Sequence, residues 1–260
     1  VEKLLNDGCP LVFVTGKAGT GKTTLIHYLR KKLNKNVVVA APTGVAALNV
    51  KGSTIHSFFR LPPRIINDDD IKEVRKRVVY EKIGLLIIDE VSMVRADLID
   101  AIDKFLRLNG PQAGEPFGGI QVLFVGDLFQ LPPVVKRQEE EILAARQYES
   151  PFFFSAKALQ DREFSPVELT KIYRQTDAEF AEMLNRIRVA EGLGPVVARV
   201  NRQCAGRSDE HPFLITLTCK NAAADEINQL KLQELPGEVK AFLGEVSGKF
   251  AVQEEKLPSP

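Results

Sequence analysis

The stretch Gly16-Lys17-Ala18-Gly19-Thr20-Gly21-Lys22-Thr23 decides the fold class of this chain. It fits the pattern G-x-x-x-x-G-K-[ST], in which glycines let backbone N–H groups wrap around a phosphate. An apolar run over residues 11–15 precedes it, and an apolar-periodic run over residues 23–33 follows it. Because a buried strand, a glycine loop and a helix stand in that order, the stretch predicts a phosphate-binding loop rather than a chance glycine turn.

The loop supplies the candidate ligands of a nucleoside triphosphate. Lys22 can reach the β- and γ-phosphates, and the Thr23 hydroxyl can ligate Mg²⁺. The N-terminus of the following helix adds favourable partial charge. The candidate nucleotide-binding residues are Gly16, Ala18, Gly19, Thr20, Gly21, Lys22, Thr23 and Thr24.

Strands and helices alternate around this loop. The first 150 residues contain predicted strands at 11–15, 37–41, 84–88 and 120–125 and predicted helices at 23–33 and 96–108. Such alternation indicates an α/β fold with a parallel sheet, which we expect to span residues 1–150.

The pattern restarts after Pro151. Its predicted elements are strands at 166–169 and 213–217, helices at 178–190 and 222–235, and short β-like runs within 237–260. We therefore expect a second domain over residues 151–260.

Two polar segments follow predicted buried strands. Asp89 and Glu90 follow the run 85–88, where a carboxylate faces the ligand crevice of an α/β sheet. We expect Asp89 to hold Mg²⁺ and Glu90 to orient or deprotonate the attacking water. Gln130, in the segment 126–133, is placed to hydrogen-bond the γ-phosphate or that water.

The segment 41–59 offers candidate nucleic-acid contacts. Thr43 and Gly44 follow a strand at a turn, where a hydroxyl and backbone N–H groups suit a phosphate. His56 and Phe58 are able to stack on bases, although Phe58 is equally suited to packing in the core. Pro132, in a rigid loop beside Gln130, is a further candidate contact.

Two basic features have both a functional and a plain interpretation. Arg174 precedes a predicted helix and is either a surface arginine or a residue that reaches across a cleft to the transferred phosphoryl group. An insertion over residues 61–82 is predicted to hold a helix at 71–80 that Asp68, Asp69 and Asp70 cap. Its basic run 75–77 forms either a solvated face or a nucleic-acid contact.

Composition narrows the function classes. The chain has 260 residues, with 35 Lys and Arg against 34 Asp and Glu, so a charged disordered chain is excluded. The sequence lacks a run of 18 apolar residues, so we expect no membrane span. Its three cysteines form no CxxC pair, which argues against a zinc site and for an intracellular protein.

Several stretches together resemble one enzyme family, the superfamily 1B DNA helicases, and within them the PIF-one-like group of RecD-like helicases. The matching stretches are GKAGTGKT at 16–23, APTGVAALNVKGSTIHSFF at 41–59, LLIIDEVSMVRADLID at 85–100, PFGGIQVLFVGDLFQLPPV at 116–134, YRQTDAEFAEMLNRIR at 173–188 and LITLTCKNAAADEIN at 214–228.

The resemblance implies two RecA-like domains with ATP and Mg²⁺ between them and 5′-to-3′ translocation that unwinds duplex DNA. By matched position, Lys22, Glu90, Gln130 and Arg174 would be catalytic, Thr23 and Asp89 would hold the metal, and Thr43, Gly44, His56 and Phe58 would contact DNA. The insertion at 61–82 corresponds to a small wedge that splits the duplex.

The resemblance also implies partners and a cellular setting. They are single-stranded and forked DNA, roles in DNA repair, recombination and telomere maintenance, and a monomer in the nucleus, mitochondrion or bacterial cytoplasm. The family's upstream glutamine and its later motifs are missing, so we expect a fragment that carries the first motor domain and part of the second. A non-motor P-loop ATPase and a non-catalytic nucleotide- or DNA-binding module are the alternatives.

Overall fold

A computed structural model describes residues 1–205, 215–238 and 240. Its strands are β1 (Leu11–Gly16), β2 (Val37–Ala41), β3 (Ser53–Thr54), β4 (Leu85–Ile88), β5 (Gln121–Val125) and β6 (Ser165–Leu169). Its helices are α1 (Glu2–Asn6), α2 (Lys22–Lys32), α3 (Gly44–Asn49), α4 (Ile55–Phe59), α5 (Val78–Glu81), α6 (Ala96–Asn109), α7 (Arg137–Ala145), α8 (Ala178–Arg188), α9 (Leu193–Cys204) and α10 (Asn221–Gln233).

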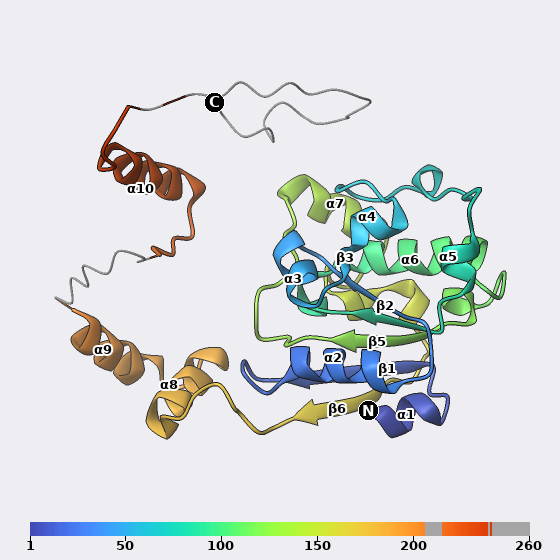
Figure 1. The fold of residues 1–260 in the computed structure, drawn as a ribbon, viewed down its shortest axis with the longest axis horizontal. Coiled ribbons are helices and arrows are strands. Elements are labelled where there is room, and N and C mark those ends of the chain that lie inside the picture. The colour runs from blue at the N-terminus through green and yellow to red at the C-terminus, as the bar shows by residue number, and fades with distance from the viewer. Residues whose placement is uncertain (206–214, 239, 241–260) are drawn as a thin grey trace. The chain divides into compact units, whose positions relative to one another are not determined.

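The six strands form one sheet in the order β3-β2-β4-β5-β1-β6, and every adjacent pair is parallel (Figure 1). The predicted α/β class is therefore confirmed. The strands and helices expected over residues 11–41 and 84–125 are present to within one residue at either end.

Both faces of the sheet are buried, which explains why its strands are continuous apolar runs. Along β4, Leu86 and Ile88 contribute to one core cluster, which contains the buried apolar residues of α6. Leu85 and Ile87 contribute to the other, which contains residues of α1 and α2. Successive side chains of a strand point to opposite faces, so both layers of helices are packed on the same few residues.

The predicted domain boundary near residue 150 is wrong. β6 pairs with β1 in parallel, from Val12 opposite Ser165 to Gly16 opposite Leu169, so this strand completes the first sheet rather than starting a second. Phe153 is also buried in the first core. The first compact unit runs from Val1 to Gln203, so residues beyond 150, including the edge strand β6, belong to it.

The second unit begins at Cys204, and within its described residues α10 confirms the helix predicted at 222–235. Of the strand predicted at 213–217, residues 215–217 are not in a strand, and residues 213–214 lie outside the described part. The β-like runs predicted within 237–260 lie almost entirely outside it as well. A partial second RecA-like domain therefore stays a prediction. None of the described helices has the length and apolarity to cross a bilayer.

The insertion at 61–82 is part of the first unit. The prediction of a helix over 71–80 is wrong. Only α5 is helical at its end, and Asp68–Asp70 form a short 3₁₀ turn. The Asn109 side chain accepts a hydrogen bond from the Val74 N–H at 2.8 Å and donates one to the Lys72 carbonyl at 3.1 Å. These tertiary bonds take the place of helical ones, and residues 71–77 are not helical.

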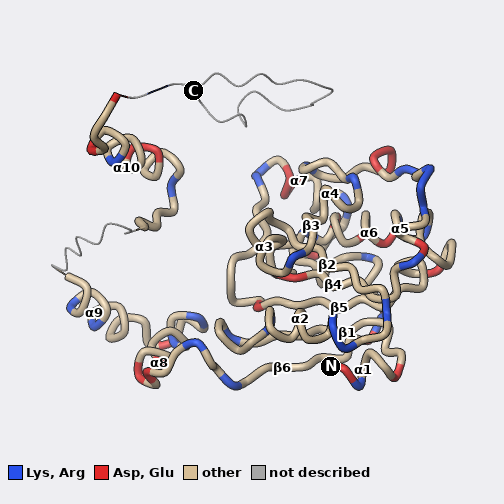
Figure 2. Tube along the Cα trace, viewed as in Figure 1, with Lys and Arg blue, Asp and Glu red and all other residues tan. Residues whose placement is uncertain are grey.

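The basic run 75–77 lies on the segment that leads into α5 and shows in blue in Figure 2. Arg75 and Lys76 are exposed, and Arg77 is paired with Glu73. An exposed basic run fits both interpretations that the sequence left open, a solvated face and a nucleic-acid contact.

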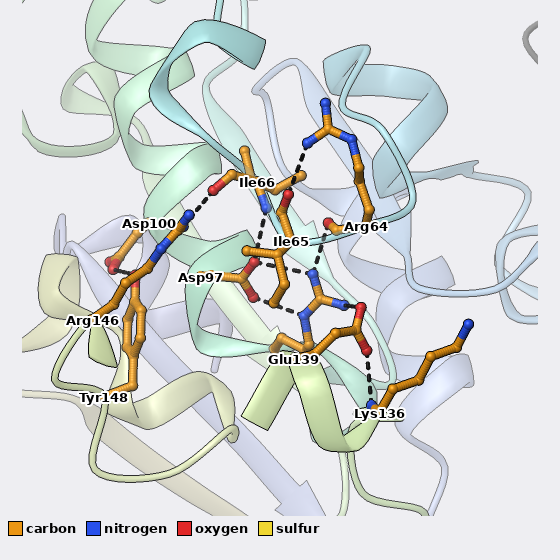
Figure 3. A network of polar contacts seen from close by, with 10 residues as sticks. Arg64, Ile65, Ile66, Asp97, Asp100, Lys136, Glu139, Arg146 and Tyr148 are labelled. Carbon is orange, nitrogen blue, oxygen red and sulfur yellow. Dashed lines mark hydrogen bonds and ion pairs between the residues drawn. The ribbon is translucent and has the colours of Figure 1, made fainter. Parts of the chain in front are cut away.

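A buried polar network holds the start of the insertion to α6 and α7 (Figure 3). Asp97, whose side chain is 1% exposed, accepts two hydrogen bonds from Arg95 and one from the Ile66 N–H. Arg95 also donates to the Arg64 carbonyl and pairs with Glu139. The ion pair is bidentate, and its remaining groups are satisfied by the backbone, as buried charges require.

Asp97→Ala should lower the free energy of unfolding by about 3 kcal/mol, because it removes the bidentate partner of the buried Arg95 guanidinium and leaves the Ile66 N–H without an acceptor. Urea denaturation followed by circular dichroism measures this. Asp69→Ala, at an exposed position on the same insertion, is the matched control and should stay within about 0.5 kcal/mol of the unmodified chain. Equal stability of the two variants would contradict the anchoring role of Asp97.

Candidate nucleotide-binding site

The parallel sheet gathers the predicted site residues at one edge. The carboxyl end of β1 leads into the loop 16–23, that of β4 into Asp89 and Glu90, and that of β5 into Asp127 and Gln130. β4 and β5 are neighbours, and β5 also pairs with β1, so the three segments leave the sheet side by side. In open α/β sheets, this edge is where ligands bind.

The phosphate-binding loop is held in shape by its own lysine. Lys22 Nζ donates to the Gly16 carbonyl at 2.7 Å and to the Lys17 carbonyl at 3.1 Å. Thr20 Oγ1 donates to the same Lys17 carbonyl at 2.8 Å. Gly19 has a φ of +79°, and a side chain there would meet the Cβ atom of Arg174, so glycine is required.

One cavity of about 360 Å³ brings most of the predicted residues together. It is lined by Ala18, Gly19, Gly21, Lys22, Thr23, Thr24, Glu90, Gln130, Tyr173 and Arg174. Gly16 and Thr20 do not line this cavity, but both take part in hydrogen bonds within the loop. All four predicted catalytic residues therefore share one space with the phosphate-binding loop.

Asp89 lies beside this cavity, at its boundary with a second one of about 240 Å³. The two cavities share Thr23, Glu90 and Gln130. Thr23 and Asp89, the predicted metal ligands, both line the second cavity. A hydroxyl and a carboxylate oxygen are donors that suit Mg²⁺.

Burial sets the charge balance of the site. It raises the pKa of Asp89, which is 6% exposed, to about 6, although the backbone N–H of Glu90 opposes the rise; the Glu90 carboxylate adds to the rise and Lys22 opposes it. Burial also lowers the pKa of Lys22, although the carboxylates of Asp127, Glu90 and Asp89 oppose this effect. A divalent cation and a polyphosphate would supply the opposite charges that these desolvated groups lack.

Glu90 has a strained backbone. Its φ of +50° and ψ of +43° lie in the left-handed region, which non-glycine residues rarely adopt. Such strain is common at catalytic positions, where the surrounding fold enforces it.

Arg174 approaches the site from the same compact unit as the loop, not across a cleft between two domains. The Tyr173 N–H donates to the Gly19 carbonyl at 2.8 Å, so the segment after β6 lies directly on the phosphate-binding loop. The expectation that Arg174 reaches over from a second domain is therefore corrected, because β6 belongs to the first sheet.

The structure adds residues that sequence reasoning did not single out. Asp127 is fully buried and pairs with Arg188 of α8 at 2.7 Å. Ser92 Oγ is buried without a hydrogen-bond partner and lines the second cavity. Asp127 directly follows a glycine at a strand end, and this position could have marked it as a site residue. Arg188 lies far along the chain, and nothing in the local sequence indicates that it pairs with Asp127.

The predicted DNA contacts fall into two groups: one lies in the segments that follow β2 and β5, and the other, Phe58 and His56, lies on α4. Gly44 and Pro132 are exposed, and Thr43 Oγ1 caps α3 by accepting from the Ala46 N–H, which leaves its own O–H free to donate. Phe58 is half-buried, and its ring packs edge-to-face on Phe59 and Tyr80. The ring centres are 4.9 Å apart for Phe59 and 5.4 Å apart for Tyr80.

His56 belongs to the second group. Burial lowers its pKa, and its Nδ1 is buried without a partner.

The chain matches the family model described as PIF1-like helicase over residues 1–193. It is 34% identical to the ATP-dependent DNA helicase PIF1 of Saccharomyces cerevisiae over 95% of this chain and 29% of the relative. It is also 34% identical to the PIF1 of Emericella nidulans over 91% of this chain and 32% of the relative. The chain therefore spans about a third of the length of these relatives.

Solved structures agree. The Pif1 helicase from Bacteroides in complex with ADP-AlF3 and single-stranded DNA superposes with a TM-score of 0.83 and 43% identity, over 92% of this chain and 56% of that one. The Pif1 helicase from Candida albicans superposes with a TM-score of 0.74 and 30% identity, over 91% of this chain and 53% of that one. Because the family model matches residues 1–193, which is more than half of this chain, the chain belongs to the PIF1-like helicase family.

Proposed function

We propose that this chain is the nucleotide-hydrolysing part of an ATP-dependent DNA helicase that moves 5′ to 3′ along single-stranded DNA and unwinds duplex. The observation that carries the proposal is the single cavity that Lys22, Glu90, Gln130 and Arg174 share, although they come from four separate segments. The relatives support it, because they are named ATP-dependent DNA helicases. The Bacteroides Pif1 structure contains ADP-AlF3 and single-stranded DNA.

The proposed chemistry is attack of water on the γ-phosphorus. Lys22 leaves the loop carbonyls and neutralises the phosphates, and Arg174 neutralises charge that develops on the transferred group. Thr23 and Asp89 would hold Mg²⁺, which when bound spreads the charge of the β- and γ-phosphates. The oxygen of the water bonds to the γ-phosphorus while the bond between the γ-phosphorus and the β-phosphate oxygen breaks, so that ADP leaves. Glu90 accepts a proton from the attacking water in this step.

The proposed DNA path follows the 41–59 and 126–133 segments, which leave the sheet at the same edge as the nucleotide loop. Gly44 and Pro132 are exposed there, Thr43 is half-buried, and His56 is a half-buried residue of the same 41–59 segment. The partners would be single-stranded and forked DNA. The Pif1 structure described at forked double-stranded DNA, which superposes with a TM-score of 0.81, supports this choice.

Further parts of the proposal rest on the family resemblance. They are a monomeric motor, an intracellular location, the wedge role of residues 61–82, and service in DNA repair, recombination or telomere maintenance. Measurement of ATP hydrolysis by this chain, with and without single-stranded DNA, tests the central claim. Stimulation by DNA supports a motor, DNA-independent turnover favours a non-motor ATPase, and binding without turnover favours a binding module.

Lys22→Ala should abolish ATP hydrolysis while salt-sensitive DNA binding remains, because it removes the ammonium proposed to neutralise the β- and γ-phosphates. Phosphate release and fluorescence anisotropy with labelled single-stranded DNA measure the two activities. Lys17→Ala is the matched control, since the Lys17 side chain does not line the nucleotide cavity. Retained turnover in Lys22→Ala would refute the assignment.

Glu90→Gln should still bind ATP–Mg²⁺ but hydrolyse it on the order of 10²- to 10⁴-fold more slowly, because the amide cannot accept the proton of the attacking water. Equilibrium binding of a fluorescent ATP analogue and single-turnover hydrolysis separate the two effects. Loss of nucleotide binding would show instead that Glu90 acts in binding and not on water.

Phe58→Ala should lower the free energy of unfolding by about 2 kcal/mol, because the ring packs on two aromatic neighbours. Phe58→Leu keeps most of the packing, and we expect near-normal affinity for single-stranded DNA in that variant. If Phe58→Leu were stable but lost about 1–3 kcal/mol of DNA affinity, the ring would be a stacking platform and not a packing residue.

A further inference from the structure

Asp127 is the buried centre of a small polar group next to the nucleotide cavity. Its carboxylate is 0% exposed at the carboxyl end of β5. Arg188, near the end of α8, donates to it twice, from Nη2 to Oδ1 at 2.7 Å and from Nε to Oδ2 at 3.0 Å. This is the two-pronged pairing that gives arginine and carboxylate a fixed mutual orientation.

The same carboxylate also orders the loop that follows. Oδ1 accepts the Phe129 N–H at 3.1 Å, and Oδ2 accepts Nε2 of Gln130 at 3.3 Å. The Arg188 guanidinium lies 4.2 Å from the centre of the Phe129 ring, at a cation–π distance. Two side chains, Arg188 and Gln130, and one backbone amide thus donate to Asp127.

The pair is charged rather than neutral. Burial by itself would raise the pKa of Asp127, but the hydrogen bonds from Arg188 and the Phe129 N–H outweigh it and leave the pKa below its usual range. A buried carboxylate of this kind needs its partner, so removal of Arg188 would disturb everything that the carboxylate holds.

The orientation of the Gln130 amide has a chemical consequence. An attacking water must point a lone pair at phosphorus, so its two protons need two acceptors. Glu90 supplies one, and Gln130 can supply the other only through Oε1. Because Nε2 is engaged by Asp127, Oε1 is the atom left for the cavity. A reversed amide would place a donor against the attacking lone pair.

We propose that Arg188 is a positioning residue for hydrolysis: through the buried Asp127 carboxylate, it fixes the Gln130 amide with its oxygen toward the attacking water. The inference rests on the proposed ATPase function and deepens it. It also makes α8 part of the site, although no α8 side chain lines the nucleotide cavity.

A double-mutant cycle tests whether Arg188 acts through Gln130. Arg188→Gln should lower kcat by about 10²-fold with ATP binding nearly unchanged, as expected when a reacting group is misplaced. Gln130→Ala should lower it similarly, and the double variant should be no slower than the slower single variant. Fully multiplicative losses would overturn the proposal, because a merely structural defect adds to the loss of Gln130.

Arg186→Gln is the matched control. Arg186 lies on the same helix in an exposed pair with Glu182, so this variant should keep the kcat and melting temperature of the unmodified chain. A loss of kcat in Arg186→Gln equal to that in Arg188→Gln would assign the effect to α8 as a whole and overturn the specific role of Arg188.

A second measurement needs no activity. The chain contains no tryptophan, so Phe129→Trp places a lone fluorophore against Arg188. In that background, Arg188→Gln should increase quenching by acrylamide, and Arg186→Gln should not. Equal quenching in Phe129→Trp alone and in its combinations with Arg188→Gln and with Arg186→Gln would overturn the proposed contact, whether or not the chain hydrolyses ATP. Failure of the unmodified chain to hydrolyse ATP, with or without DNA, would count against the proposed function instead.

Discussion

The parallel pairing of β1 with β5 and of β5 with β4 is the constraint on which the rest of the site depends. Parallel strands end at the same edge, so three segments separated by tens of residues leave the sheet next to one another. The register is held because each strand is buried on both faces and a slip by one residue would exchange the two cores. Lys22, Glu90 and Gln130 meet because the strands before them cannot move relative to one another.

This edge carries charges that the fold only partly compensates. Asp127 has a full partner in Arg188, which keeps it ionised within the protein. Asp89 has none of comparable strength, and its pKa is raised to about 6 by burial. Lys22 is bound to loop carbonyls rather than to a carboxylate. The groups with full partners hold the shape of the site, and those without them are the ones proposed to meet metal and phosphate.

The insertion shows how tertiary contacts override local preference. A run with helical periodicity and three acidic residues before it predicts a helix, but Asn109 hydrogen-bonds its backbone in a non-helical form and Val74 is buried in the core. Asp97 and Arg95 then hold the start of the insertion to α6. A segment held in this way moves with the first unit, which is the mechanical requirement for the proposed wedge.

The sequence by itself determined the α/β class, four strands of the sheet, two long helices of the first unit and the glycine-rich loop between β1 and α2. Each of these depends on local pattern: a continuous apolar run, a 3.6-residue period, or glycines at fixed spacing. It could not determine where the first unit ends, because whether β6 adds to β1 depends on a pairing between distant residues. For the same reason it did not reveal that Arg188 holds Asp127, or that Phe58 packs on Tyr80. Only the tertiary structure decides such contacts, since a side chain on one element carries no local sign of the partner that another element brings to it.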